Sequence, residues 1–156
     1  MASRVVRTPA EEQAIRDALA RSKRPAYEQY EFTVVTELLT ANAQRRMHYR
    51  VWGPVMSMAR SSAYIMAKQA KIPKLVRAHI HVFPGQHRGV LADPGNHYPM
   101  AKAVIDGLVD ASILEDDNGK SVECISLHAP QRTAQPQLRV VLVPVDRIGD
   151  TALHCE

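Results

Sequence analysis

The strict alternation of apolar and polar residues over residues 76–83 constrains the fold of this chain more than any other local pattern. The apolar members are Val76, Ala78, Ile80 and Val82, and the polar members between them are Arg77, His79 and His81. Because successive side chains of a strand point to opposite faces, this pattern predicts a half-buried strand. Such a strand buries its apolar face only when other elements cover it.

Helical patterns on both sides of that strand supply the covering elements. Apolar residues recur near helical spacing over residues 53–70, and a second helix is expected over residues 99–112. Gly107 inside the second helix predicts close packing against a neighbouring element. A third helix, over residues 9–22, begins with the capping pattern Thr8-Pro9-Ala10-Glu11 and is expected to be an appendage.

Three more strands complete the expected order of elements. They fall over residues 30–39, 122–127 and 138–143, while residues 40–46 are predicted to be a polar, basic connection and residues 84–89 a loop or hairpin turn. The order is helix, strand, helix, strand, helix, strand, strand. This order predicts an α+β fold with a small mixed sheet of about four or more strands, two main helices and an extra N-terminal helix.

Length and charge define the broad class of protein. The 156 residues predict one main domain over residues 26–148, with a tail and appended helix over residues 1–25 and a second tail over residues 149–156. The formal net charge of +4 favours an anionic partner, although a solvated basic surface fits the same charge. Aromatic residues make up only 5% of the chain, which argues against a stacking platform for single strands.

The chain is expected to be cytoplasmic and not bound to a membrane. It contains no run approaching the roughly 18 apolar residues that a membrane-spanning helix needs. Its basic N-terminus lacks the apolar core of a signal peptide. Cys124 and Cys155 show no metal-type spacing, and we expect both to be reduced thiols.

Acidic residues gather on both sides of the helix expected over residues 99–112. Asp93 precedes it in the segment Asp93-Pro94-Gly95-Asn96, and Asp116-Asp117 follows it, while Lys102 lies in its first turns. Carboxylate oxygens suit Mg²⁺, or Mn²⁺ in its place, better than zinc. The pattern predicts metal ligands at Asp93, Asp116 and Asp117, with Lys102 stabilising charge on a phosphate and Asn96 capping the helix or orienting a ligand.

Structural roles explain the same residues without any chemistry. The segments 93–96 and 116–119 are both ordinary turn sequences. Lys102 and Asp106, four residues apart, fit a surface ion pair worth less than about 1 kcal/mol. His79 and His81 point to one side of a strand with no obvious third ligand, so structural roles are favoured over metal binding. A helix over residues 99–112 is also about 20 Å long, which separates Asp93 from Asp117 unless the flanking segments fold back.

The acidic segments taken together resemble the RusA-like family of Holliday junction resolvases. That family has an Asp-x-Asp-Asn motif before a helix with a Lys, then an Asp-(Gly/Ala)-Leu segment and an Asp-Asp pair that leads into a strand. The matching residues here are Asp93, Asn96, Lys102, Asp106-Gly107-Leu108 and Asp116-Asp117 with Val122. The segment Thr40-Ala41-Asn42 and the basic residues after it are similar to the family's loop after its first strand. The resemblance covers roughly residues 28–145.

Two departures separate the chain from the common family pattern. Gly95 stands in the place of the second aspartate, and three additional residues separate Asn96 from Lys102. Both are similar to a variant subset found in phages and actinobacterial hosts, with an Asp-Pro-small-Asn pattern.

The resemblance implies a Mg²⁺-dependent endonuclease that resolves four-way DNA junctions by paired phosphodiester hydrolysis. Asp93, Asp116, Asp117 and Lys102 would be catalytic, and the protein would be a homodimer whose sites are assembled within one subunit or between two. The residues expected to contact DNA are Asn42, Arg45, Arg46, Arg50, Lys68, Lys71 and Lys74, with Arg77 and Arg88 as further cations.

Two other functions remain open at this point. Because Gly95 removes a carboxylate, the chain also fits a junction-binding or DNA-binding protein with weak or no catalysis. It also fits a small structural or assembly protein whose acidic segment only caps a helix.

Overall fold

A computed structural model describes residues 29–145 of the chain. The helix expected over residues 9–22, the C-terminal tail over residues 149–156 and Cys155 lie outside the described residues. No helix within residues 29–145 has the length and apolar character needed to cross a membrane.

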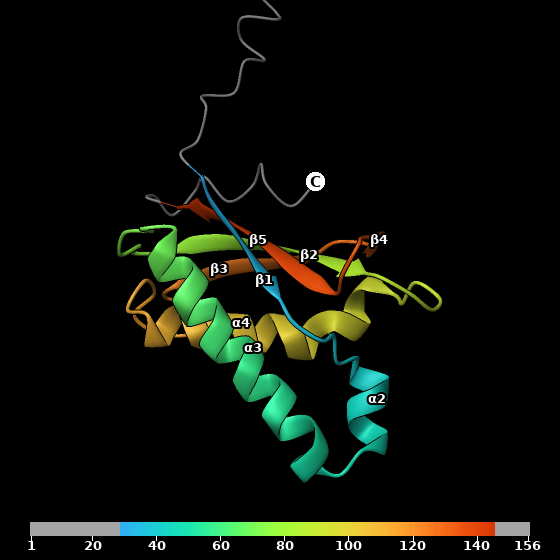
Figure 1. Cartoon of the computed structure of the whole chain (residues 1–156). Helices are drawn as coiled ribbons and strands as arrows, with labels where there is room; N and C mark the ends of the chain where they lie inside the picture. Colours follow the sequence, from blue (N-terminus) through green and yellow to red (C-terminus); the bar gives the residue numbers. More distant parts are fainter. Residues whose placement is uncertain (1–28, 146–156) are drawn as a thin grey trace, which may run out of the picture.

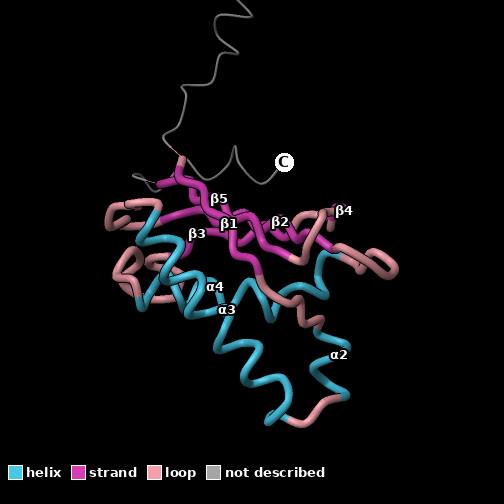
Figure 2. Tube along the Cα trace, in the orientation of Figure 1, coloured by secondary structure: helices cyan, strands magenta, loops and turns pink. Residues whose placement is uncertain are grey.

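The described residues form one mixed sheet with helices on one of its faces (Figure 1; Figure 2). The sheet contains the strands β1 (Tyr30–Val35), β2 (Ala78–Gln86), β3 (Val122–Leu127), β4 (Gln131–Arg132) and β5 (Gln137–Pro144). The strand order is β1-β5-β2-β3, with β4 also paired to β2. β5 is antiparallel to both β1 and β2, whereas β3 and β4 are parallel to β2. The expected α+β fold with a mixed sheet is therefore confirmed.

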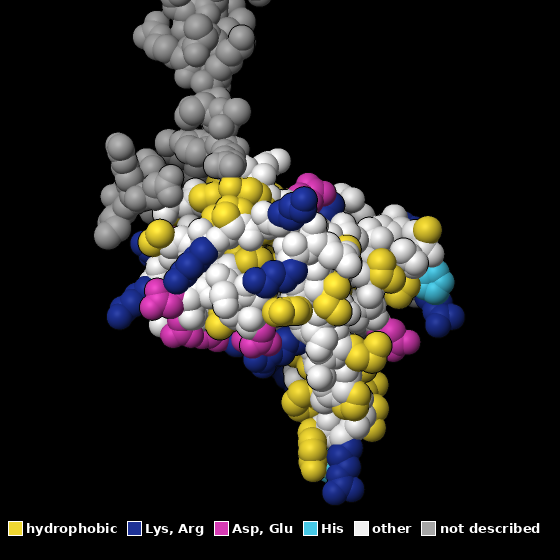
Figure 3. Space-filling view, turned by 60° about the vertical axis from the view of Figure 1, so that its left-hand side comes forward, with side chains coloured by type: hydrophobic (Ala, Val, Ile, Leu, Met, Phe, Trp, Pro, Cys, Tyr) yellow, Lys and Arg dark blue, Asp and Glu magenta, His cyan; other side chains and the backbone are white. Residues whose placement is uncertain are grey.

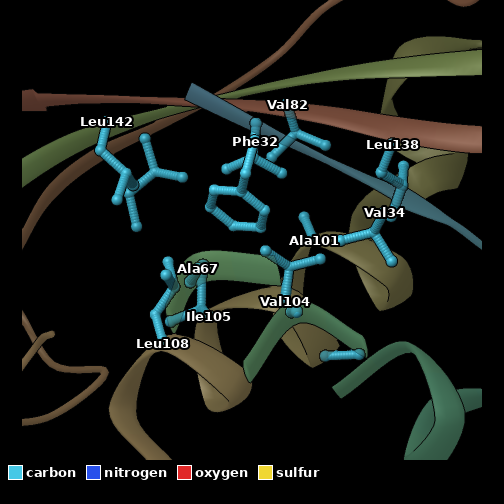
Figure 4. Packing of buried hydrophobic residues seen from close by; sticks show 14 of the residues in the cluster. Phe32, Val34, Ala67, Val82, Ala101, Val104, Ile105, Leu108, Leu138 and Leu142 are labelled. Carbon is cyan, nitrogen blue, oxygen red and sulfur yellow. The ribbon is translucent and has the colours of Figure 1, made fainter. Parts of the chain in front are cut away.

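Two long helices cover the sheet and bury its apolar face. They are α3 (Tyr49–Gln69) and α4 (Tyr98–Asp110), and α4 follows the 3-10 turn η1 (Pro94–His97). Figure 4 shows strand residues such as Phe32, Val82 and Leu142 packed against Val104 and Ile105 of α4. In β2, Ala78, Ile80 and Val82 are fully buried, as the alternation predicts. The alternation fails at Val76, which precedes the strand and is exposed, and His79 on the other face is also buried.

Small residues let α3 and α4 approach closely. Ala59, Ala63 and Ala67, spaced one helical turn apart, are the buried residues of α3. A Cβ added to Gly107 of α4 would overlap the backbone carbonyl oxygen of Arg60 and lie 2.9 Å from Cβ of Ala63. The close packing expected from Gly107 is confirmed.

Several segments differ from the expectation, among them the strand expected over residues 30–39, which ends at Val35. Residues 40–46 are not only a connection, because Thr40 caps a short helix, α2 (Ala41–Arg46), by accepting a hydrogen bond from the backbone N–H of Ala43 at 3.2 Å. The next helix, α3, begins at Tyr49 rather than at Gly53-Pro54, so Pro54 lies inside it. β2 continues through Pro84 and Gly85 to Gln86 instead of turning.

The extension of β2 has a local explanation in its neighbours. β3 pairs with β2 up to Val82, and β4 pairs with it again from Gly85. Pro84 lies between these two pairings, where its missing N–H removes no hydrogen bond to either strand. Gly85 allows residues 133–137 to approach, because an added Cβ would lie 2.6 Å from the side chain of Thr133.

Candidate active site

Lys102, in the second turn of α4, connects this helix to the acidic loop that follows it. Its Nζ donates to the carboxylate of Asp106, one turn further along α4, and forms an ion pair with Oδ2 of Asp117 at 2.6 Å. Asp106 and Asp117 are 11 residues apart in the sequence. The ammonium group therefore holds the helix and the following loop together at one point.

The chain reaches this point by reversing direction after α4. Ser112 adopts a left-handed conformation with φ of 58°, and its N–H donates to the carbonyl of Val109 at 2.9 Å. Ile113 N–H donates to the carbonyl of Leu108 at 3.0 Å, and both Ile113 and Leu114 are buried. These contacts are those of a helix end closed by a left-handed residue. They send residues 114–117 back along α4, which overcomes the helix-length separation for Asp117.

Hydrogen bonds within the loop fix Asp116. Its Oδ1 accepts from the backbone N–H of Asp117 at 2.8 Å, and its Oδ2 accepts from Nδ2 of Asn118 at 2.6 Å. The backbone N–H of Asp116 donates to Oγ of Ser121 at 3.3 Å. Segment 116–119 is thus a turn, and Asp116 is exposed at its start, beside Asp117.

The electrostatics of this cluster favour charged Lys102 and charged Asp117. Burial lowers the pKa of Lys102, but the hydrogen bonds and charges of Asp106 and Asp117 outweigh it and raise that pKa above its ordinary value. The hydrogen bond from Lys102, together with its positive charge, lowers the pKa of Asp117. The ion pair therefore persists over the whole neutral pH range.

A second ion pair extends the charged row from α4 to α3. Arg60 Nη2 donates to Oδ1 of Asp110 at 2.7 Å, and Nε of the same guanidinium contacts Oδ2 at 2.5 Å. This bidentate contact lowers the pKa of Asp110. Between the two ion pairs, a depression of about 250 Å³ is lined by Met56, Ser57, Arg60, Ala103 and Asp106. Sequence reasoning missed Arg60 because its partner lies fifty residues away.

The Asp93 side chain makes no hydrogen bond or ion pair with Lys102, Asp106 or Asp117. Asp93 lies just before η1 with an exposed side chain that makes no capping hydrogen bond. Among residues 29–145, no three His, Cys, Asp or Glu side chains are grouped closely enough to hold a metal ion. Within one chain, the three predicted ligands Asp93, Asp116 and Asp117 therefore do not form a finished metal site. Asn96 is half-buried in η1, where its backbone N–H donates to the carbonyl of Asp93 at 3.0 Å.

The predicted DNA-contacting residues are all exposed, and they form two groups. Asn42, Arg45, Arg46 and Arg50 lie on α2 and at the start of α3, whereas Lys68, Lys71 and Lys74 lie at and just beyond the end of α3. Arg50 and Lys68 are separated by 18 residues of helix, or about 27 Å. Within residues 29–145, none of these cations has an ion-pair partner. Arg77 differs, because Glu123 of β3 neutralises it.

The first basic group belongs to a projecting part of the molecule that we call the arm, residues 41–58. It contains α2 and the first half of α3, and no residue in it is fully buried. Figure 3 shows the arm as a narrow projection with hydrophobic side chains along it and Lys or Arg side chains at its end. Trp52, Val55 and Met56 attach its base to the core as partly buried residues.

The histidines of β2 contact other side chains on the sheet face opposite to the helices. Nε2 of His79 lies 2.8 Å from Oγ of Ser126, and Nδ1 of His81 lies 2.9 Å from Nε2 of His128. The rings of His128 and Phe83 stack with centroids 4.0 Å apart, and the Arg139 guanidinium lies 4.0 Å from the centroid of the Phe83 ring. These contacts give the histidines structural partners.

His97 is a buried residue that the sequence did not single out. It lies at the junction of η1 and α4 with no exposed surface, and neither ring nitrogen has a hydrogen-bond partner. Burial lowers the pKa of His97 and keeps the ring neutral near pH 7.

No family model matches this chain. No curated protein shows significant sequence similarity to it either.

Proposed function

We propose that this protein is a Mg²⁺-dependent, structure-selective DNA endonuclease of the RusA-like type that cuts four-way junctions. The contact between Lys102 and Asp117 is the observation that carries the proposal. It joins the helix lysine and the loop aspartate, which the family motif also pairs as functional residues. The contact also gives the turn at residues 116–119 a partner outside the turn itself, since its Asp117 is paired with a lysine of α4.

The roles follow from the chemistry of each side chain. Asp93, Asp116 and Asp117 are the proposed metal ligands, and bound Mg²⁺ supplies activated water and neutralises charge on the phosphate. Lys102 stabilises negative charge on the phosphate that is attacked. Asp106 holds Lys102 in place through their shared hydrogen bond. The unpaired cations of the arm and of segment 68–74 hold the phosphates of the DNA arms.

The resemblance implies a homodimer, and we propose that its metal sites are shared between subunits, since no group of three ligands forms among residues 29–145 of one chain. The Asp93 side chain is exposed and without a hydrogen bond or ion pair among the described residues, so it is available to a second subunit. We place Asp93 of one subunit beside Asp116 and Asp117 of the other. A two-fold dimer of this kind has two sites and suits paired cuts in a two-fold junction.

Separate D93N and D117N variants test the site and its assembly. Each is expected to abolish nicking of a labelled four-way junction in Mg²⁺ while binding the junction normally, because only a carboxylate charge is lost. Mixing and refolding the two variants should restore nicking, since the mixed dimer contains one intact Asp93–Asp117 pair. Continued inactivity of the mixture would place each site within one subunit. Normal nicking by D93N alone would overturn the assignment.

A second function, junction binding without catalysis, is supported by Gly95. An added Cβ at this position meets no atom within 4 Å, so a side chain there is tolerated. If the missing carboxylate has abolished catalysis, the wild-type protein binds junctions without cutting in Mg²⁺ or Mn²⁺. The G95D variant should then gain nicking. If the wild-type protein already cuts junctions, G95D should change only its metal affinity. Calorimetry that detects neither divalent-ion binding nor DNA binding would favour a structural protein instead.

A further inference from the structure

The outermost part of the arm combines exposed apolar side chains with arginines. The connection between α2 and α3 lies at its end, as the path of the chain in Figure 1 shows. Met47, Tyr49 and Val51 are exposed there by 44%, 58% and 59%. Solvated helix ends normally carry polar residues, so this composition indicates that the end of the arm meets a partner.

Neighbouring side chains hold Tyr49 in position. The His48 and Tyr49 rings lie 4.6 Å apart, and Nε of Arg50 donates to Oη of Tyr49 at 3.4 Å. His48 caps α3 by accepting a hydrogen bond from the Arg50 backbone N–H at 3.2 Å. The ring is therefore displayed on a helix end with local supports, which lowers the entropy cost of using it in binding.

The charge around Tyr49 favours a polyanionic partner. Residues 38–92 contain no Asp or Glu, but they contain nine Lys and Arg. Arg45, Arg46 and Arg50 are neighbours in sequence of the exposed apolar residues, and all three lack ion-pair partners among the described residues. Nucleic acid offers both features that this surface matches, namely phosphates for the arginines and flat apolar base faces for the ring.

We propose that the end of the arm is a wedge that recognises the branch point of DNA. Tyr49, flanked by Met47, stacks on a base pair whose neighbour is missing at the crossover, while the three arginines hold the phosphates on either side. Base faces are covered in intact duplex and uncovered at a branch. The wedge therefore accounts for a preference for branched DNA over duplex, and it rests on the proposed function.

Binding assays in EDTA test the wedge without any cutting. We measure the affinity of the full chain for a four-way junction and for duplex of the same length, and we probe branch thymines with permanganate, which attacks unstacked bases. Y49A should lose about tenfold or more in junction affinity with little change for duplex. It should also lose the change in branch-thymine reactivity that wild-type protein produces. Y49F should behave as wild type, because the ring is retained.

Tyr64 provides the matched control. It is 41% exposed on the same helix, fifteen residues or about 22 Å from Tyr49, and Y64A should leave junction binding unchanged. Unfolding temperatures of all variants should agree with that of wild type, which excludes a folding defect. Equal losses in Y49A and Y64A, or equal losses for junction and duplex, would overturn the wedge.

The remaining outcomes separate the wedge from the proposed nuclease. Tight, Tyr49-dependent junction binding without nicking in Mg²⁺ would keep the wedge and refute the nuclease. Nicking in Mg²⁺ by a protein whose junction affinity is unchanged by Y49A would keep the nuclease and refute the wedge. Absence of any DNA binding would overturn both proposals. Tyr49-dependent binding to vesicles containing anionic lipid, without a junction preference, would assign the surface to membranes and also overturn the wedge.

Discussion

The arm and helix α4 use charge in opposite ways. On the arm, Arg45, Arg46 and Arg50 are exposed and have no acidic partner among residues 29–145. On α4, Lys102 is shared between two carboxylates, and Asp110 forms a bidentate ion pair with the guanidinium of Arg60. Unpaired cations are available to an external anion, whereas paired ones have a fixed geometry. Under the proposed function, the arm would serve binding, and α4 with its return loop would serve chemistry.

Burial separates the same two regions. Eight of the 13 residues of α4 are buried, but the arm contains no buried residue. A helix packed on all but one side holds its charged residues to a narrow range of positions. A thin projection attached at its base is easier to displace and easier to change. Changes in the two regions should therefore affect different measurements.

The largest expected effect is on cutting and comes from Lys102. K102Q should lower the nicking rate by roughly 10²–10³-fold, in line with the loss of one group that stabilises charge in a transition state. Junction affinity should stay within a few-fold of wild type, measured by anisotropy in EDTA. R60Q removes a cation from the same row without touching Lys102 and serves as the control. A K102Q protein that loses affinity and rate equally would contradict the separation of roles.

The next effect is on affinity and comes from the arm. The triple variant R45Q/R46Q/R50Q should weaken junction binding and reduce the slope of log affinity against log salt by about 2 to 3, because each lost phosphate contact changes the slope by about 0.9. Its nicking rate at saturating DNA should be unchanged.

The opposite end of α3 provides the comparison for this variant. K68Q/K71Q/K74Q removes the same charge about 27 Å away along the helix axis. Equal effects of the two triple variants would show that DNA spans both ends of α3. A salt slope that changes only in K68Q/K71Q/K74Q would show that DNA binds at the end of α3 and not on the arm.

A smaller effect is on stability and has opposite signs in the two regions. Gly107→Ala should destabilise by about 1–3 kcal/mol from overpacking, partly offset by about 1 kcal/mol of helix propensity. Gly53→Ala in α3, where an added Cβ meets no atom within 4 Å, should stabilise by up to about 1 kcal/mol. Denaturant unfolding measures both changes. A stabilising Gly107→Ala would show that α3 and α4 separate readily.

The smallest effect is the pH dependence contributed by His97. Burial lowers the pKa of His97, so the unfolded chain takes up a proton near its ordinary value of 6.5 while the folded chain does not. Stability should therefore fall as the pH drops below about 6.5 toward the lowered pKa. His97→Leu should remove this part of the acid sensitivity, as followed by unfolding temperatures from pH 7.5 to 5.5. Identical pH profiles for the two proteins would contradict the assignment.

Sequence patterns predicted the elements whose periodicity is set by burial. The alternation predicted β2, and the periodic apolar residues of α4 are its buried side. In α3 the helix was predicted but its buried side was not, because Met58 and Ile65 are exposed and the small residues Ala59, Ala63 and Ala67 face the core. The pairing of Lys102 with Asp106 also followed from their spacing of four residues. These features depend on local order alone, which a sequence displays directly.

Features that depend on backbone geometry or on distant partners were not predictable. The meeting of Lys102 and Asp117 depends on a left-handed Ser112, a conformation that nothing in the serine side chain specifies. The short helix α2 has no apolar period and depends on the Thr40 cap. The start of α3 at Tyr49 was not predicted, because proline is typical of the first turn of a helix and Pro54 here lies in the second turn.

The parallel pairing of β2 with β3 has a consequence for how this protein can change. Parallel neighbours require a crossover, and this crossover contains η1, α4 and the return loop, hence every acidic residue of the motif from Asp93 to Asp117. The arm lies in a separate connection, between β1 and β2. Insertions or deletions that reshape the arm therefore leave the spacing of the acidic residues intact. If the proposed function holds, substrate preference could diverge among descendants while the proposed catalytic residues are inherited together on one continuous segment.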